Sequence, residues 1–196
     1  MEGSFLKSRL RTEIRQRRRA LARTARESAD QAINQTLLQL VENTGCTSLS
    51  AFRQFDGEPD LRPALDVLSR RGLHIVLPVI VGAAAKPRLQ FRAWSPATPL
   101  EKNFFGIEEP AGDEVVLPQD LDLVLLPLVA WDERGNRLGM GAGYYDRALA
   151  PVADCKHPLR VGVAYGLQRV DQLPADPWDI RLHQVITENG GFTCIE

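Results

Sequence analysis

The stretch from Arg137 to Arg147, RLGMGAGYYDR, contains the residue types that phosphate chemistry needs. Gly139, Gly141 and Gly143 stand at alternate positions. A backbone without side chains can adopt conformations closed to other residues, and it can turn successive N–H groups toward an anion. The flanking arginines suit phosphate oxygens, and Asp146 suits a hard cation such as Mg²⁺. A helix predicted directly after the loop would add the partial positive charge of its N-terminus. The stretch therefore predicts a nucleotide phosphate site.

A loop with alternate glycines also has a simpler explanation, because many such loops only make tight turns. Tyr144 stands where the dinucleotide-binding pattern needs its third glycine, and no Gly-Lys-Ser/Thr follows as in a Walker loop. As an isolated pattern, the loop favours phosphate binding and a plain turn about equally.

A longer match adds specificity. The apolar run LLPLVAWD at 125–132 and the segment GNRLGMGAGYYDR at 135–147 resemble, in this order, the signature of the 5-formyltetrahydrofolate cyclo-ligase family. The resemblance extends over nearly the whole chain and implies one family domain over residues 1–196. It implies that 5-formyltetrahydrofolate is converted to 5,10-methenyltetrahydrofolate with Mg²⁺ and ATP, releasing ADP and phosphate. It also implies ATP contacts by Arg137, Leu138, Gly139, Met140, Gly141, Ala142, Gly143, Tyr144 and Tyr145.

The same resemblance assigns further roles within this loop. Arg137 and Tyr144 are the expected catalytic residues, with Arg137 on phosphate charge. Tyr144 and Tyr145 would shape the junction between nucleotide and folate. The segment from Met140 to Tyr144 would also contact the folate substrate, and Met140 and Ala142 occupy the variable positions of the loop.

The N-terminal segment is strongly basic, with nine basic and four acidic residues among the first 30. Leu6, Leu10 and Ile14 recur every four residues and predict one apolar helix face. The basic residues then have three interpretations: a polyanion partner, a solvated helix face, or contact with a nucleotide bound elsewhere. The family resemblance favours the third, because Lys7-Ser8-Arg9-Leu10-Arg11 is similar to the family's ATP-binding N-terminal pattern.

The segment DGEPDLRP at 56–63 reads as a turn into a helix, in which Glu58 would be an exposed acid. It is similar to the family segment whose glutamate contacts folate, so Glu58 is the expected folate-binding residue. A carboxylate suits a pterin, which presents amino and ring N–H donors in a row. Arg53 falls at a second folate-contact position by spacing only.

Two aspartates are the expected Mg²⁺ ligands. Asp146 ends the glycine loop, and the family supplies a second aspartate from a loop shortly before a late strand. Asp179 matches that position best, with Asp176 as the nearby alternative; either could equally be a surface turn residue.

Predicted strands alternate with predicted helices, which indicates a single three-layer α/β domain whose central, mostly parallel sheet is flanked by helices. Thr24 and Glu27 have the spacing of a capping box that would start the second helix, and Gly45 would stop it. The predicted helices are 4–21, 24–44, 61–71 and 145–149. The predicted strands are 47–52, 73–81, 89–94, 121–130, 160–165 and 184–187, the last being the final strand. Pro78 predicts a strand end or an edge.

Composition narrows the alternatives. The 196 residues carry a formal net charge of -1, so nothing in the overall charge attracts nucleic acid. No apolar run reaches the length of a membrane span, and the Arg-rich N-terminus lacks the apolar region of a secretory signal. Three widely spaced cysteines, Cys46, Cys155 and Cys194, predict reduced thiols in a cytoplasmic protein. The sequence does not give the oligomeric state; a monomer is the working expectation.

Two other function classes stay open: a nucleotide-binding regulatory module without catalysis, and a nucleic-acid-binding protein that uses the basic N-terminal helix. The intact signature with Asp146 and both tyrosines argues against the first. The near-neutral net charge weakens the second.

Overall fold

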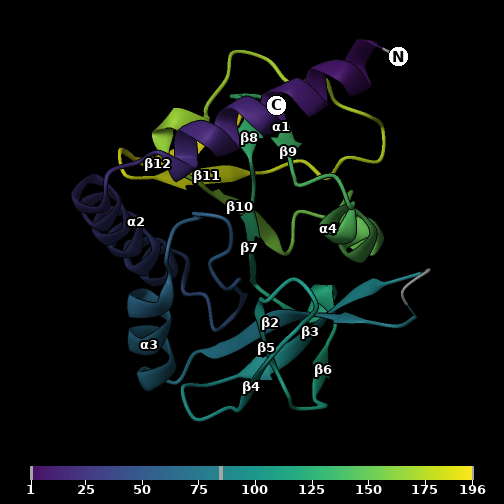
Figure 1. Ribbon diagram of the computed structural model, residues 1–196. Helices are drawn as coiled ribbons and strands as arrows, with labels where there is room; N and C mark the ends of the chain where they lie inside the picture. Colours follow the sequence, from purple (N-terminus) through teal and green to yellow (C-terminus); the bar gives the residue numbers. More distant parts are fainter. Residues whose placement is uncertain (1, 84–85, 196) are drawn as a thin grey trace.

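The chain folds into helices and strands around a central sheet (Figure 1). The computed structural model describes residues 2–83 and 86–195. The helices are α1 (Glu2–Arg19), α2 (Arg23–Thr44), α3 (Arg62–Arg70) and α4 (Tyr144–Leu149), with short 3-10 turns η1 (Pro118–Asp120), η2 (Ala150–Val152) and η3 (Gly166–Gln168). The strands are β1 (Ser48–Ser50), β2 (His74–Val81), β3 (Arg88–Trp94), β4 (Leu100–Lys102), β5 (Glu108–Pro110), β6 (Val115–Val116), β7 (Leu123–Pro127), β8 (Ala130–Trp131), β9 (Arg137–Leu138), β10 (Leu159–Val163), β11 (Gln184–Thr187) and β12 (Gly190–Thr193).

Eight strands of the described chain form the central sheet in the order β12-β11-β10-β7-β1-β2-β3-β6. The five strands from β11 to β2 are parallel, and β12, β3 and β6 pair antiparallel at the two edges. This confirms the predicted α/β class with a mostly parallel sheet. Strand β7 is buried on both faces, as its continuous apolar run from Leu123 to Leu126 requires.

The sheet has an apolar core on each face. One core joins Ile33 and Leu37 of α2 and Leu65 of α3 to alternate strand residues such as Leu123 and Leu125. The other core joins α4 and η2 to the opposite set, including Val124 and Leu126. The period-2 alternation of strand side chains therefore explains the layers. Helix α1 covers neither face; it packs through Ile14 on Val129, Ala130 and Leu138, beyond the carboxyl end of β7.

The local prediction for Gly45 is confirmed, and those for the capping box and the final strand are wrong. Gly45 ends α2 with a left-handed φ of 65°, as expected. The capping box is not formed: Ala22 is the N-cap residue of α2, and no side chain caps the helix. Strand 184–187 exists but is not the final strand, because β12 folds back on it through a turn at residues 188–189. No helix within residues 2–83 and 86–195 has the length and apolar character to cross a bilayer.

Pro78 lies inside β2 rather than at its end, and β2 lies between β1 and β3 rather than at an edge, so the prediction from this proline is wrong. Strand β1 pairs with β2 only as far as Val76, so that side of Pro78 needs no ladder hydrogen bond. Its other side pairs with Phe91 of β3.

Candidate functional site

The carboxyl ends of β1 and β7 mark the place where the sheet changes direction. From β1 the chain continues through α3 to β2 on one side, and it later returns to β7 on the other side of β1. In open α/β sheets, ligands bind in the crevice outside the strand ends at such a switch point. The turn that contains Glu58 follows β1, and the glycine loop follows β7 through the β8–β9 hairpin. The topology thus brings together the two segments with the strongest chemical signals.

The glycine loop needs its glycines. Gly141 has φ 103° and Gly143 has φ 65°, conformations that side-chain-bearing residues rarely adopt. A Cβ on Gly143 would lie 2.9 Å from Nη1 of Arg147, which donates to the Ala142 carbonyl. Met140 and Ala142 are exposed, so both variable positions face solvent. The loop therefore exposes backbone with few side chains, and a hydrogen bond from Arg147 to the Ala142 carbonyl holds its conformation.

Helix α4 after the loop contributes less than the sequence analysis expects. It spans six residues, Tyr144–Leu149, with Gly143 as its N-cap. So short a helix has little dipole, and phosphate charge would have to be met mainly by side chains. Leu138 is buried beneath the loop, so only its backbone could contact a ligand.

Helix α1 supplies two of those side chains. Arg11 Nε donates to the Gly139 carbonyl over 2.8 Å, and its guanidinium lies against Gly141. Lys7 Nζ lies 2.7 Å from Asp176 Oδ2 and 2.8 Å from Asp179 Oδ2. Burial lowers the pKa of Lys7, but the two carboxylates outweigh that effect and raise it, so the ammonium stays charged.

The other three residues predicted from the N-terminal motif lie differently. Ser8 and Arg9 are exposed, and Leu10 is half-buried against the core beneath α1. The structure therefore brings Arg11 to the glycine loop and Lys7, one helical turn away, to Asp176 and Asp179, whereas Ser8 and Arg9 face solvent.

The two predicted metal ligands lie close together. Asp146 Oδ1 accepts a hydrogen bond from the backbone N–H of Ile180, the residue after Asp179, over 3.2 Å. The same oxygen pairs with Arg137 Nη2 at 2.6 Å. Each carboxylate thus has a cationic partner: Arg137 for Asp146, and Lys7 for Asp179. The rival Asp176 is also bound to Lys7 and donates its N–H to Asp179.

This donor set fits Mg²⁺, although the described residues contain no group of three or more His, Cys, Asp or Glu side chains placed as a metal cage. Mg²⁺ prefers oxygen ligands, keeps several waters, and is usually held by one or two carboxylates together with substrate phosphates. Asp146 and Asp179 would supply those carboxylates.

Glu58 is buried, which overturns its interpretation as an exposed turn acid. Its Oε2 accepts a hydrogen bond from the Phe55 N–H, and its Oε1 lies 3.9 Å from Arg18 Nη1. Burial raises the pKa of Glu58 to about 7, against the attraction of Arg18 and the Phe55 N–H. A carboxyl group that titrates near neutrality at a sheet switch point is typical of a functional site.

Tyr145 connects the two halves of the site. Its ring lies 5.8 Å from the Arg137 guanidinium, and its hydroxyl is close enough to Glu58 for the two charges to interact. The Tyr145 hydroxyl and Arg137 Nε are buried without a hydrogen-bond partner among the described residues. Since buried polar groups are nearly always satisfied, these two atoms indicate a place where a ligand supplies the partner. Tyr144 lies at the loop surface, 5.4 Å from the Arg147 guanidinium.

Arg53 does not join Glu58. It pairs with Glu108 over 2.5 Å in a separate hollow of about 230 Å³, which Arg62 and Lys102 also line. Arg53 thus lies among other basic residues, Arg62 and Lys102, but no contact is seen between it and the buried carboxylate of Glu58 among the described residues.

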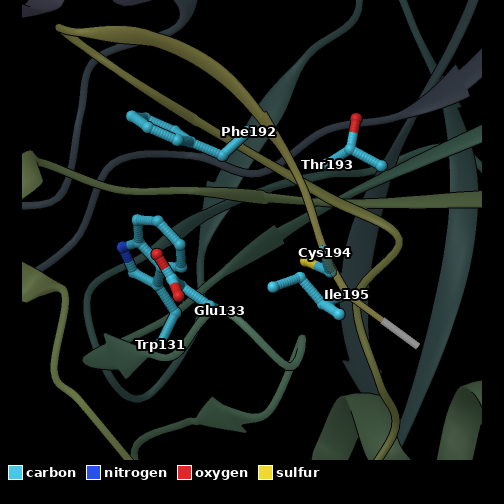
Figure 2. A pocket seen from close by; sticks show the side chains of 6 residues that line it. All are labelled: Trp131, Glu133, Phe192, Thr193, Cys194 and Ile195. Atoms are coloured by element: carbon cyan, nitrogen blue, oxygen red, sulfur yellow. The ribbon is translucent and has the colours of Figure 1, made fainter.

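A second hollow lies at the C-terminal hairpin, on the β12 side of the sheet. Figure 2 shows Trp131 and Phe192 at one end of it and Cys194 and Ile195 at the other. Its volume of about 70 Å³ is too small for a nucleotide or a folate. Burial raises the pKa of the Cys194 thiol to about 11, so it is not a thiolate nucleophile at neutral pH. Nothing here competes with the switch point as the candidate site.

Two residues of the site were missed by sequence reasoning. Arg18 is fully buried and reaches Asp56, Glu58 and the Leu128 carbonyl. The carboxylate of Asp56 forms ion pairs with three arginines. The available signal was the Asp-Gly pair of the turn, which favours positive φ, but charge pairing across 38 residues leaves no mark in the local sequence.

The fold and site define an α/β enzyme with a glycine loop and a buried carboxyl group at its switch point. Comparison with known proteins is more specific: the 5-formyltetrahydrofolate cyclo-ligase family matches residues 4–188. This chain belongs to that family, and is accordingly a ligase of folate metabolism.

Its relatives are similar over most of their length. The 5-formyltetrahydrofolate cyclo-ligase of Haemophilus influenzae is 37% identical over 90% of this chain and 95% of its own. The enzyme of Escherichia coli K12 is 39% identical over 89% and 96%. The structure of Aquifex aeolicus 5,10-methenyltetrahydrofolate synthetase aligns with a TM-score of 0.83 at 34% identity, over 97% of this chain and 94% of that one.

Proposed function

We propose that the protein closes the ring of 5-formyltetrahydrofolate to 5,10-methenyltetrahydrofolate with consumption of ATP and Mg²⁺ and release of ADP and phosphate. The family membership supports the folate conversion. The observation that carries the rest is the meeting of a bare glycine loop, cationic side chains and a buried carboxyl group at one switch point.

The chemistry explains why these groups are needed. A formamide oxygen is a poor leaving group. Transfer of the ATP γ-phosphoryl group to that oxygen forms an O–P bond, breaks the bond to the β-phosphate and releases ADP. N10 of the folate then attacks the activated carbon and loses its proton, and the carbon–oxygen bond breaks to release phosphate. Phosphoryl transfer needs positioning and charge neutralisation more than a protein nucleophile.

Each side chain then has a place. Lys7, Arg11 and Arg137 would neutralise phosphate charge, and the backbone from Gly139 to Gly143 would cradle the phosphates. Tyr144 and Tyr145 would lie at the junction of the two substrates.

The ion pairs of Asp146 and Asp179 support a role in holding Mg²⁺. When the nucleotide binds, Arg137 and Lys7 would exchange their ion pairs with the carboxylates for ion pairs with phosphate oxygens. The carboxylates would then be available to Mg²⁺, which supplies further charge neutralisation on the phosphates when bound.

Glu58 would accept hydrogen bonds from the pterin as a carboxylate. The unpartnered Tyr145 hydroxyl lies near it and would meet the same ring system. Arg53 stays a proposed contact of the more distal part of the folate, on the basis of its basic hollow.

The experiment is absorbance near the methenyl-folate band with purified protein, 5-formyltetrahydrofolate, Mg²⁺ and ATP. The band should grow only when all four are present. ATP binding without growth of the band would instead favour a nucleotide-binding regulatory module.

The nucleic-acid alternative loses its basis. Arg11, Arg15, Arg18, Arg19 and Arg26 all bind groups of the protein itself. Much of the positive charge of the N-terminal segment is therefore paired within the protein rather than available to a polyanion. The free thiols Cys46, Cys155 and Cys194 favour a reducing compartment, and we place the enzyme in the cytosol.

A further inference from the structure

The turn that contains Glu58 has a backbone that needs outside support. Asp56 has φ 52° and Gly57 has φ 77°. Two successive left-handed residues are costly when one of them carries a side chain, although aspartate tolerates this conformation better than most. Something must hold the turn in this shape, since Glu58 is fixed by it.

Three guanidinium groups of α1 converge on one carboxylate in this turn. Arg15 Nε lies 2.7 Å and Arg18 Nη2 3.0 Å from Asp56 Oδ2, and Arg19 pairs with Oδ1. The Asp56 side chain is 5% exposed and that of Arg18 is 0% exposed. Burial raises the pKa of Asp56, but the hydrogen bonds from Arg15 and Arg19 outweigh that effect and lower it, so the carboxylate stays ionised.

The backbone of the turn is held by the same helix. Arg18 Nε donates to the Asp56 carbonyl over 3.2 Å, and Arg18 Nη1 donates to the Leu128 carbonyl beyond β7 over 3.1 Å. Arg26 of α2 donates to the Gly57 carbonyl. Arg18 therefore connects the segments that follow β1 and β7, and its Nη1 lies 3.9 Å from Glu58 Oε1.

We propose that Asp56 is a positioning residue of the folate site, which holds Glu58 in place by gathering Arg15, Arg18 and Arg19 of α1 around the turn. This inference rests on the proposed folate contact of Glu58. Asp56 itself touches no reacting atom. Its substitution should weaken folate binding without affecting the nucleotide half, where Lys7 and Arg11 of the same helix make independent contacts.

The first test is Asp56→Asn, with the dissociation constants of 5-formyltetrahydrofolate and of MgATP measured separately by calorimetry, so that no turnover occurs. We expect folate affinity to fall roughly 10- to 100-fold, as displaced site geometry typically costs. MgATP affinity should stay near that of the wild type, and kcat at saturating folate should change little while KM for folate rises.

A matched surface pair guards against a variant that fails to fold. Arg19→Gln removes one of the three partners of Asp56, whereas Arg17→Gln removes an equally exposed arginine of α1 that pairs with Glu13. Arg19→Gln should weaken folate binding roughly two- to fivefold, the range of one exposed ion pair. Arg17→Gln should bind folate like the wild type, and both should melt at similar temperatures.

Unchanged folate affinity in Asp56→Asn would overturn the inference, and so would a parallel loss of folate and MgATP affinity, which would mean that the arginines only dock α1. A wild-type protein that binds 5-formyltetrahydrofolate but forms no methenyl product would refute the proposed reaction alone, because the positioning role is measured by binding.

Discussion

The two halves of α1 meet carboxylates in different ways. Toward its N-terminus, Lys7 pairs with Asp176 and Asp179; the Lys7 side chain is 13% exposed and those of the aspartates 46% and 19%. Toward its C-terminus, Arg18 and Asp56 are almost completely buried. Ion pairs become weaker and easier to exchange as their exposure to solvent increases, whereas a fully buried pair is strongly destabilised if either partner is lost. The nucleotide half is thus suited to exchanging ion pairs for a ligand, and the folate half is fixed in advance.

The sharpest test of the exchangeable half is Asp146→Asn. Asparagine keeps an oxygen for the buried Arg137 but removes the charge proposed to hold Mg²⁺. We expect kcat to fall by about 10²- to 10³-fold with the fold retained, as measured by steady-state kinetics and circular dichroism. The control is Asp154→Asn, which changes an exposed aspartate shortly after α4 and should leave kcat at the wild-type value. Near-normal turnover in Asp146→Asn would remove Asp146 from the metal site.

In the folate half, the burial of Glu58 should make the free energy of unfolding depend on pH. The pKa of Glu58 is about 7 in the folded state and 4.5 as an ordinary glutamate. Folding therefore favours the protonated form, and this stabilisation is complete below pH 4.5 and lost as the pH rises through 7. Glu58→Gln should be more stable than the wild type by up to about 3 kcal/mol at pH 8, and the difference should vanish near pH 4. Urea unfolding at several pH values measures it, and a pH-independent difference would contradict the prediction.

Folate binding should depend on the same ionisation. Below about pH 7 Glu58 gains a proton and becomes a weaker acceptor for the N–H groups of the pterin, so the affinity for 5-formyltetrahydrofolate should fall. The groups facing it are Arg15 and Arg18 of α1, Asp56 of its own turn and Tyr145 of α4. Glu58→Gln should bind folate roughly 10-fold more weakly at pH 8, with the pH dependence abolished and ATP affinity intact. Unaltered folate affinity in this variant would refute the role of Glu58.

The smallest effect should come from the loop backbone. Gly141→Ala forces a side chain onto a residue with φ 103° and against the Arg11 guanidinium, at a cost of about 1 kcal/mol or more. ATP affinity should fall severalfold while folate affinity is retained. Gly112→Ala is the control, because Gly112 has no positive φ and no atom within 4 Å of an added Cβ. Equal ATP affinities of the two variants would argue against a phosphate cradle at the loop.

The sequence predicted the parts of this molecule that depend on local pattern. The helix ended by Gly45, the glycine loop and the buried strand all follow from periodicity and turn chemistry, although the strand predicted at 121–130 is confirmed only over Leu123–Pro127. The short strands β4, β5, β6, β8, β9 and β12 were missed, since two to four residues carry too little periodic signal.

The site was predictable only in part, for a related reason. The residue types of the glycine loop and of Glu58 pointed to phosphate and pterin contacts, and the family resemblance gave them roles. The burial of Glu58 and the gathering of arginines at Asp56 arise from tertiary packing between α1 and the end of β1. No local pattern in the sequence predicts contacts between residues that lie 37 to 41 positions apart.

The contacts of Lys7 span 169 and 172 residues, almost the full chain. The contacts of Asp56 with the arginines of α1 span only 37 to 41 residues. Closing a longer loop of chain costs more entropy, and contacts between distant segments form slowly. A denatured chain that refolds should therefore assemble the folate half before the nucleotide half.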